Sequence, residues 1–274
     1  MANAEPRLLI LGAHPDDAEY HAGGLATIYR MLGRDVKMVS VTDGGAGHHE
    51  RSPAELRILR REEAAAAGRV IGATYETWDF PDAALQSSLD VRYRIIREIR
   101  QFKPDLVLTH RTSDYHPDHR AVGQSVQDAS YLVKVPHVLP DVAALQKDPV
   151  VAYMPDLFTK PVRMQPDVII DVSDCMDKIV EMLACHQSQV FQWLPHAEGI
   201  LDTVPAGAVD RMIWLRSWFS RHIRPRADHF RIELVAACGS ETDQSIEFIE
   251  AFEISEYAYR PDADMLSRLF PVHH

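Results

Sequence analysis

Two short clusters of histidine and aspartate hold the residues of this sequence that are best suited to chemistry. The first is His14-Pro15-Asp16-Asp17, and the second is His116-Pro117-Asp118-His119. Imidazole nitrogens and carboxylate oxygens are ligands that zinc and similar divalent ions prefer, and a catalytic site keeps three of them with a position open for water. A single loop histidine is more often solvated than a ligand. Two such clusters together are hard to explain as packing, because buried charges need a compensating partner.

Each cluster follows a short apolar run that is typical of a buried parallel strand. Residues 8–11 precede the first cluster, and residues 106–110 precede the second. In open α/β sheets, ligands and reactive groups gather just beyond the carboxyl ends of the strands. We therefore predict that the two clusters face each other at one edge of a sheet.

Strand and helix signals alternate along most of the chain. Strands are predicted over 8–11, 36–42, 75–78, 106–110, 150–153, 168–171, 230–237 and 248–254. Helices are predicted over 21–32, 53–70, 89–102, 121–132, 174–187 and 209–219. This alternation favours an α/β fold with a mostly parallel, helix-covered sheet and right-handed crossovers. Prolines interrupt the pattern after residue 135, so we expect an elaborated C-terminal third within a single domain over residues 1–274.

Composition narrows the class of partner. The net charge of −11 argues against nucleic acid and anionic membranes, which are bound mainly through clustered lysine and arginine. The run over residues 8–11 is too short to span a membrane. The three cysteines form no CxxC pair, which argues against a disulfide framework or a thiolate zinc site. We expect a cytoplasmic protein with a small-molecule substrate, and a homo-oligomer remains open.

The paired clusters resemble the signature of the PIG-L/LmbE-like family of zinc-dependent N-acetyl sugar deacetylases. The first cluster extends to Ala13-His14-Pro15-Asp16-Asp17-Ala18-Glu19, and the order and spacing of the two clusters match the family. Similarity continues through Thr42-Asp43-Gly44-Gly45, Leu59-Arg60-Arg61-Glu62-Glu63-Ala64, Phe80-Pro81-Asp82, His186-Gln187-Ser188-Gln189 and Glu250-Ala251-Phe252. The resemblance implies a Rossmann-like fold. It also implies removal of the N-acetyl group from an N-acetylglucosamine-type sugar or its conjugate, with metal-bound water as the nucleophile.

The resemblance also implies the metal ligands and the base. His14, Asp17 and His119 would hold one Zn²⁺, or another divalent transition metal. Asp16 would act as general base. Its place next to a proposed ligand also suits it to receive the proton of the attacking water.

Five further residues take roles from the resemblance. His116 would be an acid or an oxyanion-stabilising group, and Asp118 would orient a histidine, with His116 as the expected partner. Arg60, Asp82 and His186 would contact substrate. Each of these three also has an ordinary interpretation, which is a solvated helix residue, a turn residue and a helix C-terminal cap respectively.

Two other functional classes remain open on the sequence alone. A two-metal phosphoesterase would need His48, His49 or Glu50 to hold a second ion. A catalytically inactive sugar-binding protein would have no need of Asp16 and His116, both of which are present.

Overall fold

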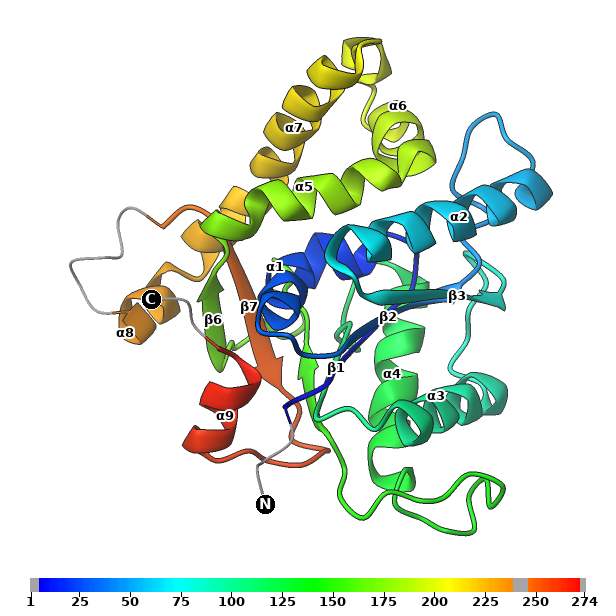
Figure 1. Ribbon diagram of the computed structural model, residues 1–274, viewed down its shortest axis with the longest axis vertical. Coiled ribbons are helices and arrows are strands. Elements are labelled where there is room, and N and C mark those ends of the chain that lie inside the picture. Colours follow the sequence, from blue (N-terminus) through cyan, green and yellow to red (C-terminus); the bar gives the residue numbers. More distant parts are fainter. Residues whose placement is uncertain (1–4, 239–245, 272–274) are drawn as a thin grey trace.

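The computed structural model describes residues 5–238 and 246–271, and it is built around one seven-stranded sheet (Figure 1). The strand order is β3-β2-β1-β4-β5-β7-β6. The strands are β1 (Leu8–Gly12), β2 (Val36–Thr42), β3 (Thr74–Phe80), β4 (Leu106–Thr109), β5 (Val150–Tyr153), β6 (Val168–Asp171) and β7 (Ile249–Ile254). The first five are parallel, whereas β7 runs antiparallel to both of its neighbours.

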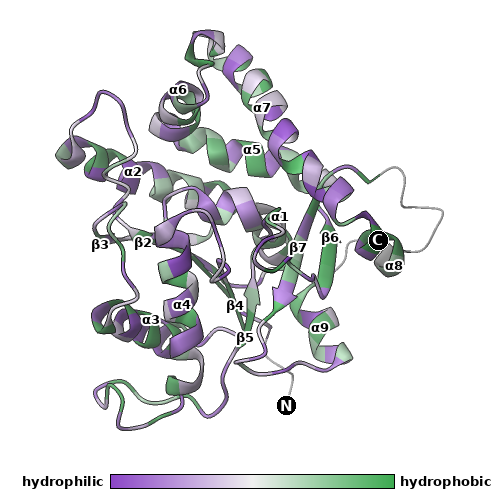
Figure 2. Cartoon of the chain, turned by 180° about the vertical axis from the view of Figure 1, so that it is seen from behind, coloured by the Kyte–Doolittle hydropathy of each residue, from purple (hydrophilic) through white to green (hydrophobic). Residues whose placement is uncertain are grey.

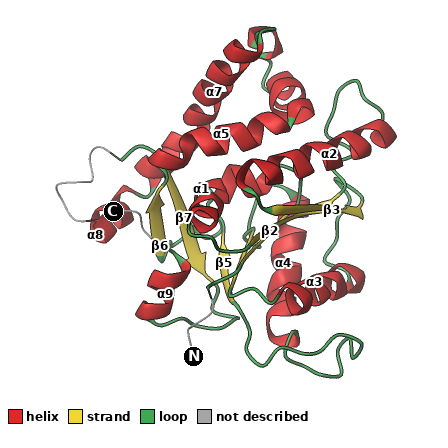
Figure 3. Ribbon diagram, in the orientation of Figure 1, coloured by secondary structure: helices red, strands yellow, loops and turns green. Residues whose placement is uncertain are grey.

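Helices cover both faces of the sheet (Figure 3). One face carries α1 (Asp17–Met31), α2 (Pro53–Ile71) and α5 (Met176–Cys185), and the other carries α3 (Leu89–Phe102) and α4 (Pro117–Leu132). The remaining helices are α6 (Leu194–Ala197), α7 (Ala208–His229), α8 (Arg231–Cys238) and α9 (Ala263–Leu269). Of these, α7 packs against α5.

Side chains alternate across the sheet and build a separate apolar core on each face. Leu8 and Ile10 of β1 enter one core, whereas Leu9 and Leu11 enter the other. Because both faces are covered, the strand is apolar throughout, which explains the continuous run in the sequence. Figure 2 shows the molecule from behind, with hydrophobic colouring along β6 and much of β7 and mixed colouring along α7.

Local signals set the helix ends. Ser52 caps α2, because its hydroxyl accepts from the Glu55 N–H and the Glu55 carboxylate accepts from the Ser52 N–H. Gly72 ends the same helix at φ 71°, a conformation that favours glycine. Helix α3 begins at a second capping serine, Ser88.

The order of strands places the predicted clusters together. Strand order reverses between β1 and β4, so the loops that follow these strands leave a crevice at the carboxyl edge. His14 lies directly after β1. The second cluster lies at the start of α4, which follows β4.

A break in α1 joins this helix to the C-terminal third. Ala22 has non-helical angles, with φ −144° and ψ 20°. The Gly24 and Leu25 N–H groups donate to Glu250 of β7 at 2.7 and 2.9 Å, and the Tyr20 carbonyl accepts from Arg226 of α7 at 3.1 Å. In an unbroken helix the Gly24 N–H would reach the Tyr20 carbonyl. Two side chains from the end of the chain therefore satisfy the broken turn.

The predicted α/β fold class is confirmed, and most elements lie where they were expected. The strand predicted over 230–237 is wrong, because α8 occupies this stretch. Phe230 and Leu234 are fully buried, whereas Ile232 between them is 79% exposed. Burial at positions i and i+4 is the pattern of a helix.

The helices and the cysteines can also be compared with the predictions from the sequence. No helix in the described ranges has the length and apolar character needed to cross a membrane. Cys175 and Cys185 are free thiols, and the side chain of Cys238 lies outside the described part of the chain.

Candidate metal and catalytic site

The three predicted metal ligands converge at the carboxyl edge of the sheet. His14 Nδ1 lies 3.3 Å from His119 Nε2 and 3.6 Å from Asp17 Oδ2, and His119 Nε2 lies 3.5 Å from Asp17 Oδ1. Ligand atoms placed at zinc–nitrogen and zinc–oxygen distances around a tetrahedral ion are separated by about 3.3–3.6 Å. The donor set therefore fits a divalent transition metal.

The described residues contain three overlapping groups that could hold an ion. They are His14-His116-His119, Asp17-His110-His119 and His14-Asp82-Asp118. Every group includes His14 or His119, and the first group, which contains both, links the other two.

The residues that a second ion would need are engaged elsewhere. His48 Nε2 lies 2.9 Å from Gln192 Oε1, and its Nδ1 accepts from the Glu50 N–H at 3.0 Å. The ring of His49 stacks on that of His196, with centroids 3.8 Å apart. None of the metal-binding groups in the described ranges includes His48, His49 or Glu50. The site therefore offers no support for the two-metal phosphoesterase.

Two residues behind the ligands were not predicted from the sequence. His110 Nε2 lies 3.0 Å from Asp17 Oδ2, and Asp114 Oδ1 lies 3.1 Å from His119 Nδ1. Metal-binding side chains are usually held by such partners. Both residues lie in the loop between β4 and α4, so their position directly before the second cluster was the available signal.

Asp118 supports a different histidine from the one expected. Its Oδ2 lies 3.3 Å from His14 Nε2, and its two oxygens accept from the Ala83 and Leu85 N–H groups at 2.8 and 3.1 Å. The expected side-chain pairing with His116 is therefore wrong. Because the proposed metal-facing atom of His14 is Nδ1, an Nε2–H bonded to Asp118 would fix the orientation of this ring.

Asp82 lies on the same side of His14. Its Oδ1 lies 3.3 Å from His14 Nε2, and its Oδ2 accepts from the Ala46 N–H at 2.9 Å. Burial alone would raise the pKa of Asp82, but its bond with His14 lowers that pKa to about 2. Asp82 is thus an ionised carboxylate beside His14.

Asp16 sits in a strained position directly before α1. Its φ is 120°, which residues other than glycine rarely adopt, and its N–H donates to the Tyr75 hydroxyl at 3.2 Å. Burial and the adjacent Asp17 raise the pKa of Asp16 to about 6. Strain of this kind often marks functional sites, and a pKa near neutrality suits a general base.

His186 lies behind this site. It is fully buried, and its Nε2 lies 2.8 Å from Glu19 Oε1, while Glu19 Oε2 accepts from the Tyr75 hydroxyl at 3.4 Å. Tyr75 in turn accepts the Asp16 N–H. His186 is thus connected to the Asp16 backbone through Glu19 and Tyr75. It also occupies the C-cap of α5, the helix C-cap position that was its ordinary interpretation in the sequence.

His116 caps the N-terminus of α4. Its Nδ1 accepts the Asp118 N–H at 3.2 Å, so the neutral ring carries its hydrogen on Nε2. Burial, together with His14 and His119, lowers the pKa of His116. The ring centroids of His116 and His14 are 4.5 Å apart. His116 is therefore placed as a neutral N–H donor beside the metal group.

Arg60 is buried at 2% exposure, so the solvated interpretation is wrong. Its Nε donates to Ser188 Oγ at 2.8 Å, and its Nη2 donates to the Gly47 carbonyl at 2.9 Å. Arg60 lines a hollow of about 250 Å³ that it shares with His14, Asp82 and His116.

A larger cavity of about 480 Å³ opens on the other side of His14. Asp16, Asp17 and His119 line its floor, and Trp218 and Arg226 of α7 line its wall. The two hollows share four lining residues, His14, Tyr115, Gln189 and Leu194, and we treat them as one cleft.

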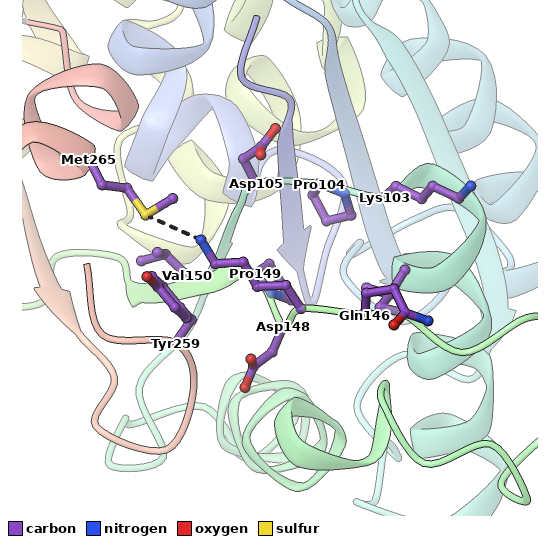
Figure 4. A pocket seen from close by; sticks show the side chains of 11 residues that line it. Lys103, Pro104, Asp105, Gln146, Asp148, Pro149, Val150, Tyr259 and Met265 are labelled. Atoms are coloured by element: carbon purple, nitrogen blue, oxygen red, sulfur yellow. Dashed lines mark hydrogen bonds between the residues drawn. The ribbon is translucent and has the colours of Figure 1, made fainter. Parts of the chain in front are cut away.

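Figure 4 shows a different hollow, of about 200 Å³, at the opposite edge of the sheet. It lies beside Asp105 and Val150, where β4 and β5 begin, and the Lys147 ammonium there lies 3.6 Å from the centroid of the Tyr259 ring. None of the metal-binding groups in the described ranges reaches it.

A cleft with a two-histidine, one-aspartate group and a buried carboxylate beside it is typical of metal-dependent hydrolases. Residues 9–130 match the PIG-L family, described as GlcNAc-PI de-N-acetylase. Over residues 9–130 this match confirms the resemblance seen in the sequence. The matched stretch contains both clusters, Arg60 and Asp82, whereas His186 and Arg226 lie beyond it.

Individual relatives fall into two activities. The chain is 26% identical over 201 residues to a 4-oxalmesaconate hydratase of Pseudomonas putida, covering 70% of this chain and 78% of the relative. It is 28% identical over 194 residues to a diacetylchitobiose deacetylase of Thermococcus kodakarensis, covering 68% and 71%. The crystal structure of GalB, the 4-carboxy-2-hydroxymuconate hydratase of P. putida KT2440, superposes with a TM-score of 0.71 at 21% identity, covering 93% of this chain and 99% of that one. This last likeness confirms the fold.

Proposed function

We propose that this protein is a metal-dependent N-deacetylase that releases acetate from an N-acetylglucosamine-type sugar or its conjugate. The observation that carries the proposal is the convergence of His14, Asp17 and His119, in which one Asp17 oxygen faces His14 and the other faces His119. Their donor atoms lie 3.3–3.6 Å apart pairwise, with Asp16 and His116 beside them. The PIG-L match over residues 9–130 supports the same reaction.

His14, Asp17 and His119 would hold the ion, which we propose to be Zn²⁺ or another divalent transition metal. When bound, such an ion polarises the amide carbonyl and lowers the pKa of water toward about 7. His110, Asp114 and Asp118 hold the three ligands in place. A raised metal affinity is the usual result of such support.

Two side chains beside the ion would carry out proton transfer and stabilisation of the developing negative charge. Asp16 takes a proton from the attacking water as the water oxygen bonds to the acetyl carbon, and it passes that proton to the amine as the C–N bond breaks. The Nε2–H of His116 donates to the carbonyl oxygen as negative charge develops there. Acetate and a free amino sugar are the products.

Arg60 and Asp82 line the smaller hollow and are proposed to bind hydroxyl groups of the sugar. Because His186 is fully buried behind Asp16, we assign it a positioning role in place of direct contact with substrate. We further propose that the chain works as one domain in the cytoplasm, with a small amino sugar as its partner.

The test is a metal-dependent amine-release assay. Protein stripped with a chelator is reloaded with Zn²⁺, Co²⁺ or Mn²⁺ and given N-acetylglucosamine, diacetylchitobiose and N-acetylglucosamine conjugates. We expect free amine in the reloaded protein and none in the stripped protein. Absence of amine from every N-acetyl sugar with every metal would overturn the proposal.

A second candidate is a metal-dependent hydratase that adds water to the double bond of an unsaturated carboxylic acid. It is favoured by the P. putida relative, at 26% identity over 70% of the chain. Both reactions use an activated water, so the same ligands and base serve either one. Loss of ultraviolet absorbance from a conjugated carboxylic acid, without amine release from any sugar, would select this candidate.

A further inference from the structure

The wall of the larger cavity contains a buried guanidinium that forms no ion pair in the described ranges, although Glu250 and the Tyr20 ring, whose centroid lies 5.4 Å from the guanidinium carbon, offset part of its charge. Arg226 of α7 is 3% exposed and lines the cavity together with His14 and Asp16. Its Nη2 donates to the Tyr20 carbonyl at 3.1 Å. Its Nη1 is buried without a hydrogen-bond partner, and no carboxylate of the described ranges lies within 4.0 Å of the guanidinium. A buried cation in this state is costly unless a partner arrives.

Other acids near the cavity already have partners. Asp156 forms an ion pair with Arg111 at 3.0 Å, and Glu198 lies 3.2 Å from His222 Nε2 and accepts from the Trp218 indole N–H at 3.0 Å. Glu250 accepts two backbone N–H groups of α1. The spare donor of Arg226 is therefore not committed to any of these side chains.

We propose that this part of the cavity binds a carboxylate carried by the substrate, with Arg226 as the residue that recognises it. A guanidinium fork matches a carboxylate and forms charge-assisted hydrogen bonds with it. Arg226 is the one arginine among the described lining residues, no lysine lines the cavity, and several acids do. This balance suits a single negative charge better than a phosphate dianion. The proposal rests on the proposed function and narrows its substrate to an acidic N-acetylglucosamine conjugate.

A purely structural role for Arg226 makes a different prediction. If the guanidinium only satisfies the Tyr20 carbonyl at the break in α1, its loss should affect acidic and neutral substrates equally. A pair of substrates that differ chiefly in the charge of one carboxyl group therefore separates the two roles. An N-acetylglucosamine that carries a single lactate carboxylate and the methyl ester of that compound form such a pair.

The experiment compares KM and kcat for the acid and the ester in the metal-loaded wild type, Arg226→Met and Arg226→Lys. Arg221→Met, an exposed change on the same helix, is the matched control. We expect the wild type to favour the acid. We expect Arg226→Met to raise KM for the acid about tenfold or more with KM for the ester within about twofold, Arg226→Lys to lie between, and Arg221→Met to match the wild type.

Equal kcat/KM for acid and ester in the wild type would overturn the proposal, even if Arg226→Met fails to fold. Equal losses on both substrates in a folded Arg226→Met protein would also overturn it. If neither of these two substrates is turned over, the broader amine-release assay decides the proposed function, and calorimetric binding of the acid decides the carboxylate site separately. Binding that depends on Arg226 supports the site, and binding that does not, or no binding, overturns it.

Discussion

The two parts of the chain contribute different things to one cleft. The part of the chain with the parallel strands, residues 8–153, supplies the three proposed metal ligands, the base and the N–H donor. They come from the loops after β1 and β4 and from the first turns of α1 and α4, the helices that follow those loops. The later part, with β7 and α7, supplies the wall that carries Trp218 and Arg226. A sheet edge fixes the chemistry, and a separate set of helices shapes what can enter. We therefore expect changes in the first part to alter kcat or metal content, and changes in the second to alter substrate choice or stability.

The largest effect should come from loss of a ligand. His119→Ala should remove the bound ion and lower activity by more than about 10⁴-fold, because both the ion and its chemistry are lost. Metal analysis of the purified protein and an amine-release assay measure the two together. The matched control in the other part of the chain is His222→Ala, a change on the cavity wall. This variant should keep its bound metal. Full metal occupancy in His119→Ala would show that His119 is not a metal ligand and would contradict the roles assigned to the two parts of the chain.

Loss of the base should separate chemistry from metal binding. Asp16→Asn should retain the ion and lose about two to four decades of kcat, the usual range for a positioned acid-base group. Steady-state kinetics on metal-replete protein gives the answer. Near-normal turnover would remove Asp16 from the mechanism.

His116 should act through the transition state. His116→Ala should lower kcat by about 10²–10³-fold with a smaller change in KM, because the donor is needed chiefly when charge develops on the carbonyl oxygen. His116→Gln keeps an N–H donor and should recover part of the loss. A variant with unchanged kcat and raised KM would show that His116 only holds substrate.

The support of His14 by Asp118 should appear as metal affinity. Asp118→Asn should weaken binding about 10–100-fold, because an amide cannot accept from both Ala83 and Leu85 while also accepting from His14. Competition with a chelator measures this change. His116→Ala is the control and should leave the affinity near that of the wild type. Weaker metal binding in His116→Ala than in Asp118→Asn would show that His116, and not Asp118, supports the metal ligands.

The last prediction concerns stability in the second part, where no change in activity is expected. Burial raises the pKa of Glu250 from 4.5 to about 7, although two N–H donors and Arg226 oppose the shift. Because the folded value is the higher one, Glu250 should lower the free energy of unfolding as pH rises from about 4.5 to 7, by up to about 3 kcal/mol.

Urea unfolding of Glu250→Gln at several pH values tests this slope. The variant should lack the decline, while Glu247→Gln, an exposed neighbour, should keep it. The same slope in all three proteins would exclude Glu250 as its source.

The sequence predicts the first part better than the second, and the reason is the range of the interactions. His14 and Asp17 lie three residues apart, and the strand-end rule brings His119 to them. The partner of Asp118 lies 104 residues away, so no local pattern could reveal that it supports His14 in place of His116. His110 and Asp114 lacked a motif of their own.

In the second part of the chain, no local sequence pattern predicted the cavity wall or α8. Arg226 owes its position to the packing of α7 over the cavity, and the sequence around it resembles that of an ordinary charged helix. The stretch that forms α8 alternates like a strand, and only its packing distinguishes Phe230 and Leu234 from the exposed Ile232. Where tertiary packing decides, local periodicity alone is a weak guide.

The break in α1 has a consequence for the order of events during synthesis. Glu250 lies 226 residues after Gly24, and β7 must enter between β5 and β6 before its carboxylate can reach that helix. Asp17, a proposed ligand, begins the same helix. A nascent chain that has emerged only through β5 already has every proposed ligand but not the side chains that satisfy the broken turn. Firm capture of the ion is therefore expected only after β7 has left the ribosome.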